Sequence, residues 1–187
     1  MEADQRVGAV ILAAGESRRF GSPKQLAELD GRTLLDHVVA TARAAGLRPV
    51  VAVVPTWLAR PAAGEGVHWI PNPHPEWGMS HSLRLGLEAL ADAEAAVILL
   101  GDQPRVAAGT IMQLLAARGD RPIVAVEAAG LLAPPVLIER SHFELATALS
   151  GDHGLRDVLR GSPELVTPVP IAQHTADIDT PADLNRA

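Results

Sequence analysis

Continuous apolar runs alternate with helix-patterned segments along this chain, and this alternation limits the fold more than any other feature. The first run, residues 7–13 (VGAVILA), contains no polar side chain at all. A strand with that pattern is covered on both faces, as the strands of parallel sheets are. Strands that alternate with helices build a doubly wound sheet. We therefore predict an α/β fold with a mostly parallel, doubly wound sheet, in a single domain that spans residues 1–187.

The remaining elements follow the same alternation, because each further apolar run is separated from the next by a helical pattern or a turn. Ligands of doubly wound sheets bind beyond the carboxyl ends of the strands, so the residues that follow strands are the first candidates for a site. Thr180, Pro181 and Asp183 form an N-cap, a first-turn proline and an acid at the start of a last helix. The other expected strands are 49–54, 67–71, 96–100, 123–126, 136–138 and 166–169, and the other expected helices are 33–45, 82–91, 109–117, 141–149 and 155–160.

Composition excludes several classes of function. The chain has no cysteine, which excludes disulfides, thiolate catalysis and Cys-ligated zinc and leads us to expect a cytoplasmic location. Residues 1–6 lack the apolar segment of a signal peptide, and no apolar run approaches the ~20 residues of a membrane span. The net charge of −6 and an aromatic content of 3% argue against nucleic acid as a partner. Any anionic ligand must therefore be bound by a local cluster of positive charge.

Such a cluster follows the first strand, in residues 12–24 (LAAGESRRFGSPK). Small residues let the backbone approach a ligand, and Gly15 and Gly21 can adopt positive φ. Exposed backbone N–H groups can cradle phosphate, with Arg19 and Lys24 adding charge. The spacing matches neither a Walker A loop nor a dinucleotide fingerprint. Lys24 is the single lysine beside fifteen arginines, and a compact ammonium suits a shifting phosphate charge. The alternative is an ordinary solvated loop.

Two carboxylates are expected near this loop. Asp102 ends the strand at 96–100, and Asp179 precedes the cap of the last helix. Magnesium prefers hard oxygen ligands, takes few of them from the protein and completes its shell with substrate phosphates. The two acids therefore form a candidate magnesium site. The alternatives are a turn acid at Asp102 and a helix-start acid at Asp179. Asp177 is a weaker candidate, because strand alternation is expected to point it elsewhere.

The segment LAAGESRRFGSPKQL resembles the signature loop of the MobA-like NTP transferases, and in particular of the molybdenum cofactor cytidylyltransferases. The similarity continues at 72–73 (NP), 78–84 (GMSHSLR), 101–104 (GDQP) and 177–181 (DIDTP). The resemblance implies a Rossmann-like nucleotidyltransferase fold in which the loop holds the triphosphate. It also implies that Arg19 and Lys24 contact phosphates as the catalytic residues, and that Asp102 and Asp179 match the metal-binding aspartates.

The same resemblance implies further contacts. Ser82 would contact the nucleotide base, unless it merely caps a helix. Gly151, Asp152 and Arg156 would meet the acceptor phosphate, unless the glycine is helix punctuation and Arg156 forms a surface pair. Ala133-Pro134-Pro135 departs from the Gly-His-Pro usual in the family, which leaves the acceptor open. The full set of implied nucleotide-binding residues is Leu12, Ala13, Ala14, Gly15, Arg19, Lys24, Asn72, Gly78, Ser82 and Asp102.

The expected activity is magnesium-dependent transfer of CMP from CTP to the phosphate of molybdopterin, with release of pyrophosphate. Ala13-Ala14 favours a pyrimidine nucleotide, since guanylyl-transferring relatives tend to carry a glycine there. The product would pass to a client molybdoenzyme or its chaperone. Two alternatives stay open: the same chemistry with GTP or with a sugar or alcohol phosphate, and a non-catalytic nucleotide-binding chaperone for a cofactor.

Overall fold

The computed structural model describes residues 6–15, 17, 19–58, 66–90, 92–147, 155–172 and 176–186. A seven-stranded sheet with the order β5-β4-β1-β6-β8-β7-β9 dominates this part of the chain. The first four strands of that order run parallel, β8 runs antiparallel to β6 and β7, and β9 runs parallel to β7. The strands are β1 (Val7–Leu12), β4 (Val50–Pro55), β5 (Val67–Asn72), β6 (Ala95–Leu100), β7 (Ile123–Ala128), β8 (Leu131–Glu139) and β9 (Val166–Pro170), and a separate hairpin joins β2 (Glu28–Leu29) to β3 (Arg32–Thr33).

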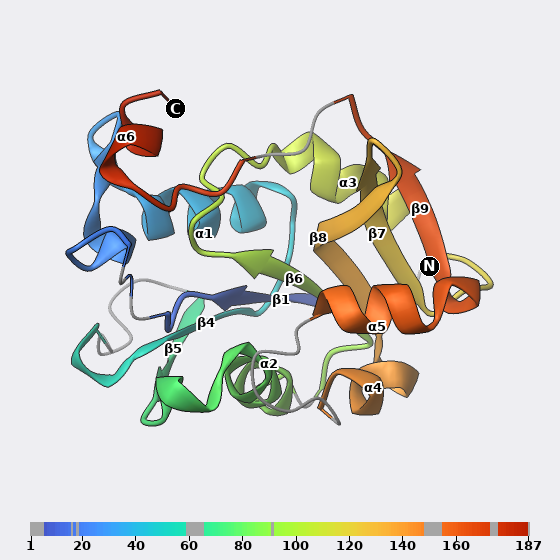
Figure 1. Cartoon of the computed structure of the whole chain (residues 1–187). Coiled ribbons are helices and arrows are strands. Elements are labelled where there is room, and N and C mark those ends of the chain that lie inside the picture. The colour runs from blue at the N-terminus through green and yellow to red at the C-terminus, as the bar shows by residue number, and fades with distance from the viewer. Residues whose placement is uncertain are drawn as a thin grey trace.

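Helices cover both faces of the sheet (Figure 1). α1 and α3 lie on one face, and α2, α4 and α5 lie on the other. Among the described residues, no helix is both long and apolar enough to cross a membrane. The helices are α1 (Leu34–Ala44), α2 (Met79–Glu88), α3 (Ala108–Ala116), α4 (Phe143–Thr147), α5 (Leu155–Gly161) and α6 (Pro181–Leu184), with single 3-10 turns η1 (Lys24–Leu26), η2 (Thr56–Leu58), η3 (Pro75–Trp77), η4 (Arg140–His142) and η5 (Pro163–Leu165).

The central strands divide their side chains between two cores. In β1, Ala9 and Ile11 pack with α1 and α3, whereas Val10 and Leu12 pack with α2 and α5. All six residues of β1 are buried, because alternate side chains enter different cores. The predicted α/β class with a mostly parallel, doubly wound sheet is thereby confirmed.

The structure differs from the sequence prediction in two places that matter for the site. The second helix begins at Met79, and its N-cap is Gly78. Ser82 therefore lies one turn inside the helix, and the interpretation of Ser82 as a cap is wrong. The strand expected at 136–138 begins at Leu131, so that it includes Ala133-Pro134-Pro135. Its two prolines obscured that strand, since proline is rarely a strand signal.

Close packing of α2 on β1 depends on a glycine. A Cβ atom at Gly86 would lie 2.3 Å from Cγ1 of Val10. Gly86→Ala should therefore destabilise the fold by about 1–3 kcal/mol, the usual cost of overpacking a core. Urea unfolding measures this change. The control is Gly109→Ala in α3, where a Cβ has no neighbour within 4 Å, and stability should stay unchanged or rise. Equal effects of the two substitutions would contradict the packing argument.

Candidate functional site

A cleft of about 450 Å³ opens at the carboxyl edge of the sheet. Its floor comes from the ends of β1 and β6, which are adjacent parallel strands. Its walls come from the loop after β1, the start of α2, the first turn of α5 and the segment before α6. The lining residues are Leu12, Ala13, Ala14, Gly15, Arg19, Lys24, Gln25, Pro75, Gly78, Met79, Ser82, Leu100, Gly101, Asp102, Arg156, Asp177 and Asp179.

The loop after β1 is held in shape by Gln25. This side chain is buried, and its Nε2 donates to the carbonyl oxygens of Ala13 at 2.8 Å and Gly15 at 2.7 Å. Ser17 has a positive φ of 54°, and its hydroxyl donates to Gln25 Oε1 at 3.3 Å while accepting from the backbone N–H of Lys24 at 3.2 Å. Sequence reasoning missed Gln25, although it directly follows Lys24. These bonds fix where the lysine side chain starts.

Two close approaches bring Asp102 and Asp179 to the same place. A Cβ atom at Gly101 would lie 2.7 Å from Cβ of Ala13, so the glycine lets the turn after β6 approach the loop after β1. The backbone N–H of Ile178 donates to the carbonyl oxygen of Asp102 at 2.9 Å. This bond places residues 176–179 alongside the end of β6.

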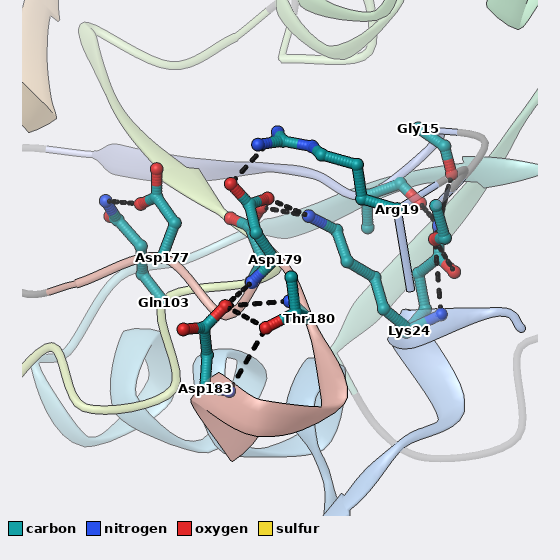
Figure 2. Close-up of polar contacts among 12 residues, drawn as sticks. Gly15, Arg19, Lys24, Gln103, Asp177, Asp179, Thr180 and Asp183 are labelled. Carbon is teal, nitrogen blue, oxygen red and sulfur yellow. Dashed lines mark hydrogen bonds and ion pairs between the residues drawn. The ribbon is translucent and has the colours of Figure 1, made fainter. Parts of the chain in front are cut away.

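Lys24 contacts the carboxylates of both Asp102 and Asp179, and Figure 2 shows its ammonium beside Asp179. Its Nζ donates to Asp102 Oδ2 at 2.5 Å and to Asp179 Oδ1 at 3.2 Å. The second oxygen of Asp179 pairs with the guanidinium of Arg19 at 2.9 Å. The side chain of Lys24 is 17% exposed and that of Arg19 is 73% exposed. One cation is therefore held inside the cleft, and a second one reaches it from the solvent side.

In this cluster, burial and the neighbouring opposite charges shift the pKa values of the side chains in opposite directions. Burial alone would lower the pKa of Lys24, but the carboxylates of Asp102 and Asp179 outweigh it and raise that pKa above its ordinary value. Burial raises the pKa of Asp102, an effect that Lys24 opposes and Asp177 reinforces. Lys24 thus carries its charge over the whole physiological pH range. Removing this ammonium would leave a buried carboxylate without its partner.

Asp177 also lines the cleft, and the expectation that it would point elsewhere is wrong. Residues 177 and 179 both line the cleft, and Ile178 between them is buried, which is the alternation expected of residues two apart. The buried side chain of Gln103 donates from Nε2 to Asp177 Oδ1 at 2.7 Å. Asp177 is therefore fixed by an amide, whereas Asp179 faces the two cations (Figure 2). Sequence reasoning missed Gln103 as well.

The wall formed by η3 and α2 holds the residues expected near a base. Gly78 and Ser82 line the cleft, whereas Asn72 is only 1% exposed and lies behind Ser82. Aromatic contacts stabilise the turn between Asn72 and Gly78. The rings of His74 and Trp77 stack with their centroids 4.0 Å apart, and the ring of Trp77 meets that of His81 edge-on at 4.9 Å. Gly78 ends η3 with a φ of 88°, a conformation that favours glycine.

The structure describes only part of the predicted acceptor-binding site. Arg156 lines the cleft and also a second cavity of about 430 Å³ between α5 and the β7–β8 hairpin. That second cavity includes Ala133, Leu132 and Arg160. Gly151 and Asp152, the other predicted acceptor residues, lie outside the described residues. Arg156 is therefore a basic group shared by two adjoining cavities.

A glycine-rich loop, two cations and two carboxylates at the carboxyl edge of a doubly wound sheet define a class of phosphate- and nucleotide-binding sites. Residues 9–169 match the model of the MobA-like NTP transferase domain. The chain belongs to that family.

Known proteins of two kinds are similar to this chain. The bifunctional protein GlmU of Halorhodospira halophila is 37% identical over 118 residues, which cover 60% of this chain and 25% of that protein. The chain therefore spans a quarter of the length of this curated relative. The crystal structure of Rv0371c from Mycobacterium tuberculosis H37Rv has a TM-score of 0.86 at 26% identity and covers 98% of both chains.

A further structure of the same mycobacterial protein contains manganese. Rv0371c in complex with manganese has a TM-score of 0.81 at 25% identity, again over 98% of both chains. Within the described residues of the present chain, no group of three or more His, Cys, Asp or Glu side chains converges as a metal site. Asp102 and Asp179 converge as a pair.

Proposed function

We propose that this protein is a magnesium-dependent nucleotidyltransferase that transfers CMP from CTP to the terminal phosphate of molybdopterin and releases pyrophosphate. The observation that carries the proposal is the position of Lys24, whose ammonium contacts Asp102 and Asp179 in a cleft bounded by the glycine-rich loop. A non-catalytic nucleotide-binding module has no evident need for a buried ammonium between two carboxylates. The family assignment supports the transfer of a nucleotidyl group.

The residues of the cleft suit this chemistry. A phosphate oxygen of the acceptor forms the new bond to the α-phosphorus of CTP, while the bond to the β-phosphate oxygen breaks and pyrophosphate leaves with the electron pair. The nucleophile is already anionic, so no side chain needs to remove a proton. Lys24 and Arg19 neutralise the charge of the triphosphate, and the loop at residues 12–15 orients it.

Asp102 and Asp179 fit a divalent cation, because both carboxylates already approach one positive charge, the Lys24 ammonium. Magnesium is commonly held by one or two carboxylates together with substrate phosphates. When bound, it would neutralise charge on the triphosphate as the transfer proceeds. The manganese complex of Rv0371c supports a divalent cation in this family.

The acceptor assignment is supported by Arg156. Its position at the boundary of the cleft and the second cavity suits an acceptor whose phosphate enters the cleft while its body occupies the cavity. A guanidinium binds phosphate through two parallel hydrogen bonds. A pterin phosphate fits this description, and Ala133, the first residue of the departure at 133–135, lies in the wall of that cavity.

CTP with Mg²⁺ should raise the melting temperature more than GTP, ATP or UTP at equal concentration, because a ligand of the native state stabilises it. At a hundredfold excess over Kd the gain is about 2.7 kcal/mol, and each kcal/mol raises Tm by about 2–4 °C for a chain of this size. Thermal unfolding with each nucleotide measures the effect. Equal shifts for the four nucleotides, or a larger shift with GTP, would contradict CTP as donor. Pyrophosphate release with molybdopterin, against sugar phosphates, then tests the acceptor.

A further inference from the structure

The hydrogen bonds of Asn72 determine whether the hydroxyl of Ser82, which faces the cleft, acts as a hydrogen-bond donor or acceptor. Asn72 ends β5 and is buried, and its Oδ1 lies 2.8 Å from the backbone nitrogen of His74. A backbone N–H can only donate, so the atom that faces it must be the amide oxygen. The amide therefore has one orientation, in which its NH₂ group faces Ser82.

This orientation fixes the role of the serine hydroxyl. Asn72 Nδ2 donates to Ser82 Oγ at 2.9 Å, and an NH₂ group cannot accept a bond in return. The Ser82 oxygen thus accepts from Asn72, and its own proton must point elsewhere. Among the described residues, the Ser82 hydroxyl has no other hydrogen-bond partner in the protein. Ser82 lines the cleft, so the direction left for its proton is towards a bound ligand.

We propose that Asn72 is a positioning residue that holds the Ser82 hydroxyl as a hydrogen-bond donor towards the nucleotide base. The base must then offer an acceptor at that point. Among the pyrimidines, cytosine has an unprotonated N3, whereas N3 of uracil carries a proton and would meet a second donor. Carbonyl O2 accepts a hydrogen bond in both bases and would not distinguish them, so the proposed contact is to N3, and a donor placed there selects cytosine over uracil. This inference rests on the proposed function, because it takes the ligand of the cleft to be a pyrimidine nucleotide.

The test compares the Kd values of CTP and UTP by calorimetry, in the presence of Mg²⁺, for the wild type and two variants. Ser82→Ala should reduce the preference for CTP about tenfold or more, the scale of one unpaired polar group. Asn72→Asp keeps the shape but replaces the NH₂ group by an oxygen that accepts the Ser82 proton. The serine lone pairs then face the base, and the preference should shift towards UTP. If Asn72 had a purely structural role, Asn72→Asp would weaken the binding of CTP and UTP to the same extent.

The control is Ser80→Ala, which removes another buried hydroxyl from the same helix outside the cleft lining and should keep the preference for CTP. If Asn72→Asp does not fold, Ser82→Ala decides alone. An unchanged CTP-to-UTP ratio in a folded Ser82→Ala protein would overturn the inference and leave the proposed function intact. A wild type that binds another nucleotide better than CTP would refute the donor assignment before any variant is made, and the inference with it.

Discussion

Lys24→Ala should lower the rate of nucleotidyl transfer ~100-fold or more, the scale on which a single charge-stabilising group acts in enzymes. The fold should persist, because the buried anchor of the loop is Gln25 and not Lys24. Lys24→Arg should restore activity in part, since a planar guanidinium is no substitute for a compact ammonium between two carboxylates. Steady-state turnover and circular dichroism measure the two properties.

The matched control removes a cation that lies outside the cleft. Arg43 is an exposed residue in the last turn of α1, and Arg43→Ala should leave turnover unchanged. Calorimetry with Mn²⁺ in the absence of nucleotide gives an independent readout. Without the ammonium that lies between Asp102 and Asp179, the free protein should bind the ion at least about fivefold more tightly, since one unit charge at 4 Å is worth ~1 kcal/mol even in water. Normal turnover together with unchanged manganese affinity would show that Lys24 is an ordinary loop residue.

The fold was predictable from the sequence because buried parallel strands appear as continuous apolar runs. Residues 7–13 contain no polar side chain, and the strand there is buried along its whole length. The pattern is weaker where pairing depends on tertiary contacts. The β2–β3 hairpin has two residues in each strand, too few for any periodicity, and β8 contains two prolines that conceal its first half.

The candidate site was predictable where charged residues follow strands. Lys24 and Asp102 follow predicted strands, and Asp179 precedes the predicted cap of the last helix, so local sequence patterns mark all three. Gln25 and Gln103 were missed because neutral amides carry no signal of their own. Their importance depends on which carbonyl or carboxylate the fold brings within hydrogen-bond distance.

The position of Asn72 shows the same limit more sharply. The family resemblance implied that Asn72 contacts the nucleotide directly, and the structure instead sets it behind Ser82. Alternation along a strand cannot distinguish a residue that touches a ligand from one that orients its neighbour. That distinction requires the hydrogen-bond geometry of both ends of the amide.

The second large effect on activity is expected from Asp102 and Asp179, the two proposed ligands of the magnesium ion. If Asp102 and Asp179 share one Mg²⁺, either loss leaves too few protein ligands for an ion that already relies on substrate phosphates. Asp102→Asn and Asp179→Asn should each abolish transfer, and the double variant should be hardly worse than either one, because residues that act as a unit are not additive. Any residual activity should require far more magnesium, which a magnesium titration of turnover measures.

The structure separates this role of Asp179 from a role in starting α6. The cap of α6 consists of Thr180 and Asp183, whose side chains bond each other's backbone N–H groups. Asp179 enters that turn through its backbone N–H alone, which Asp179→Asn retains. Asp183→Asn is therefore the matched control: it should lower Tm by weakening the cap but keep the wild-type magnesium dependence. An active Asp179→Asn enzyme with normal magnesium dependence, or multiplicative losses in the double variant, would end the proposal that the two carboxylates hold one ion.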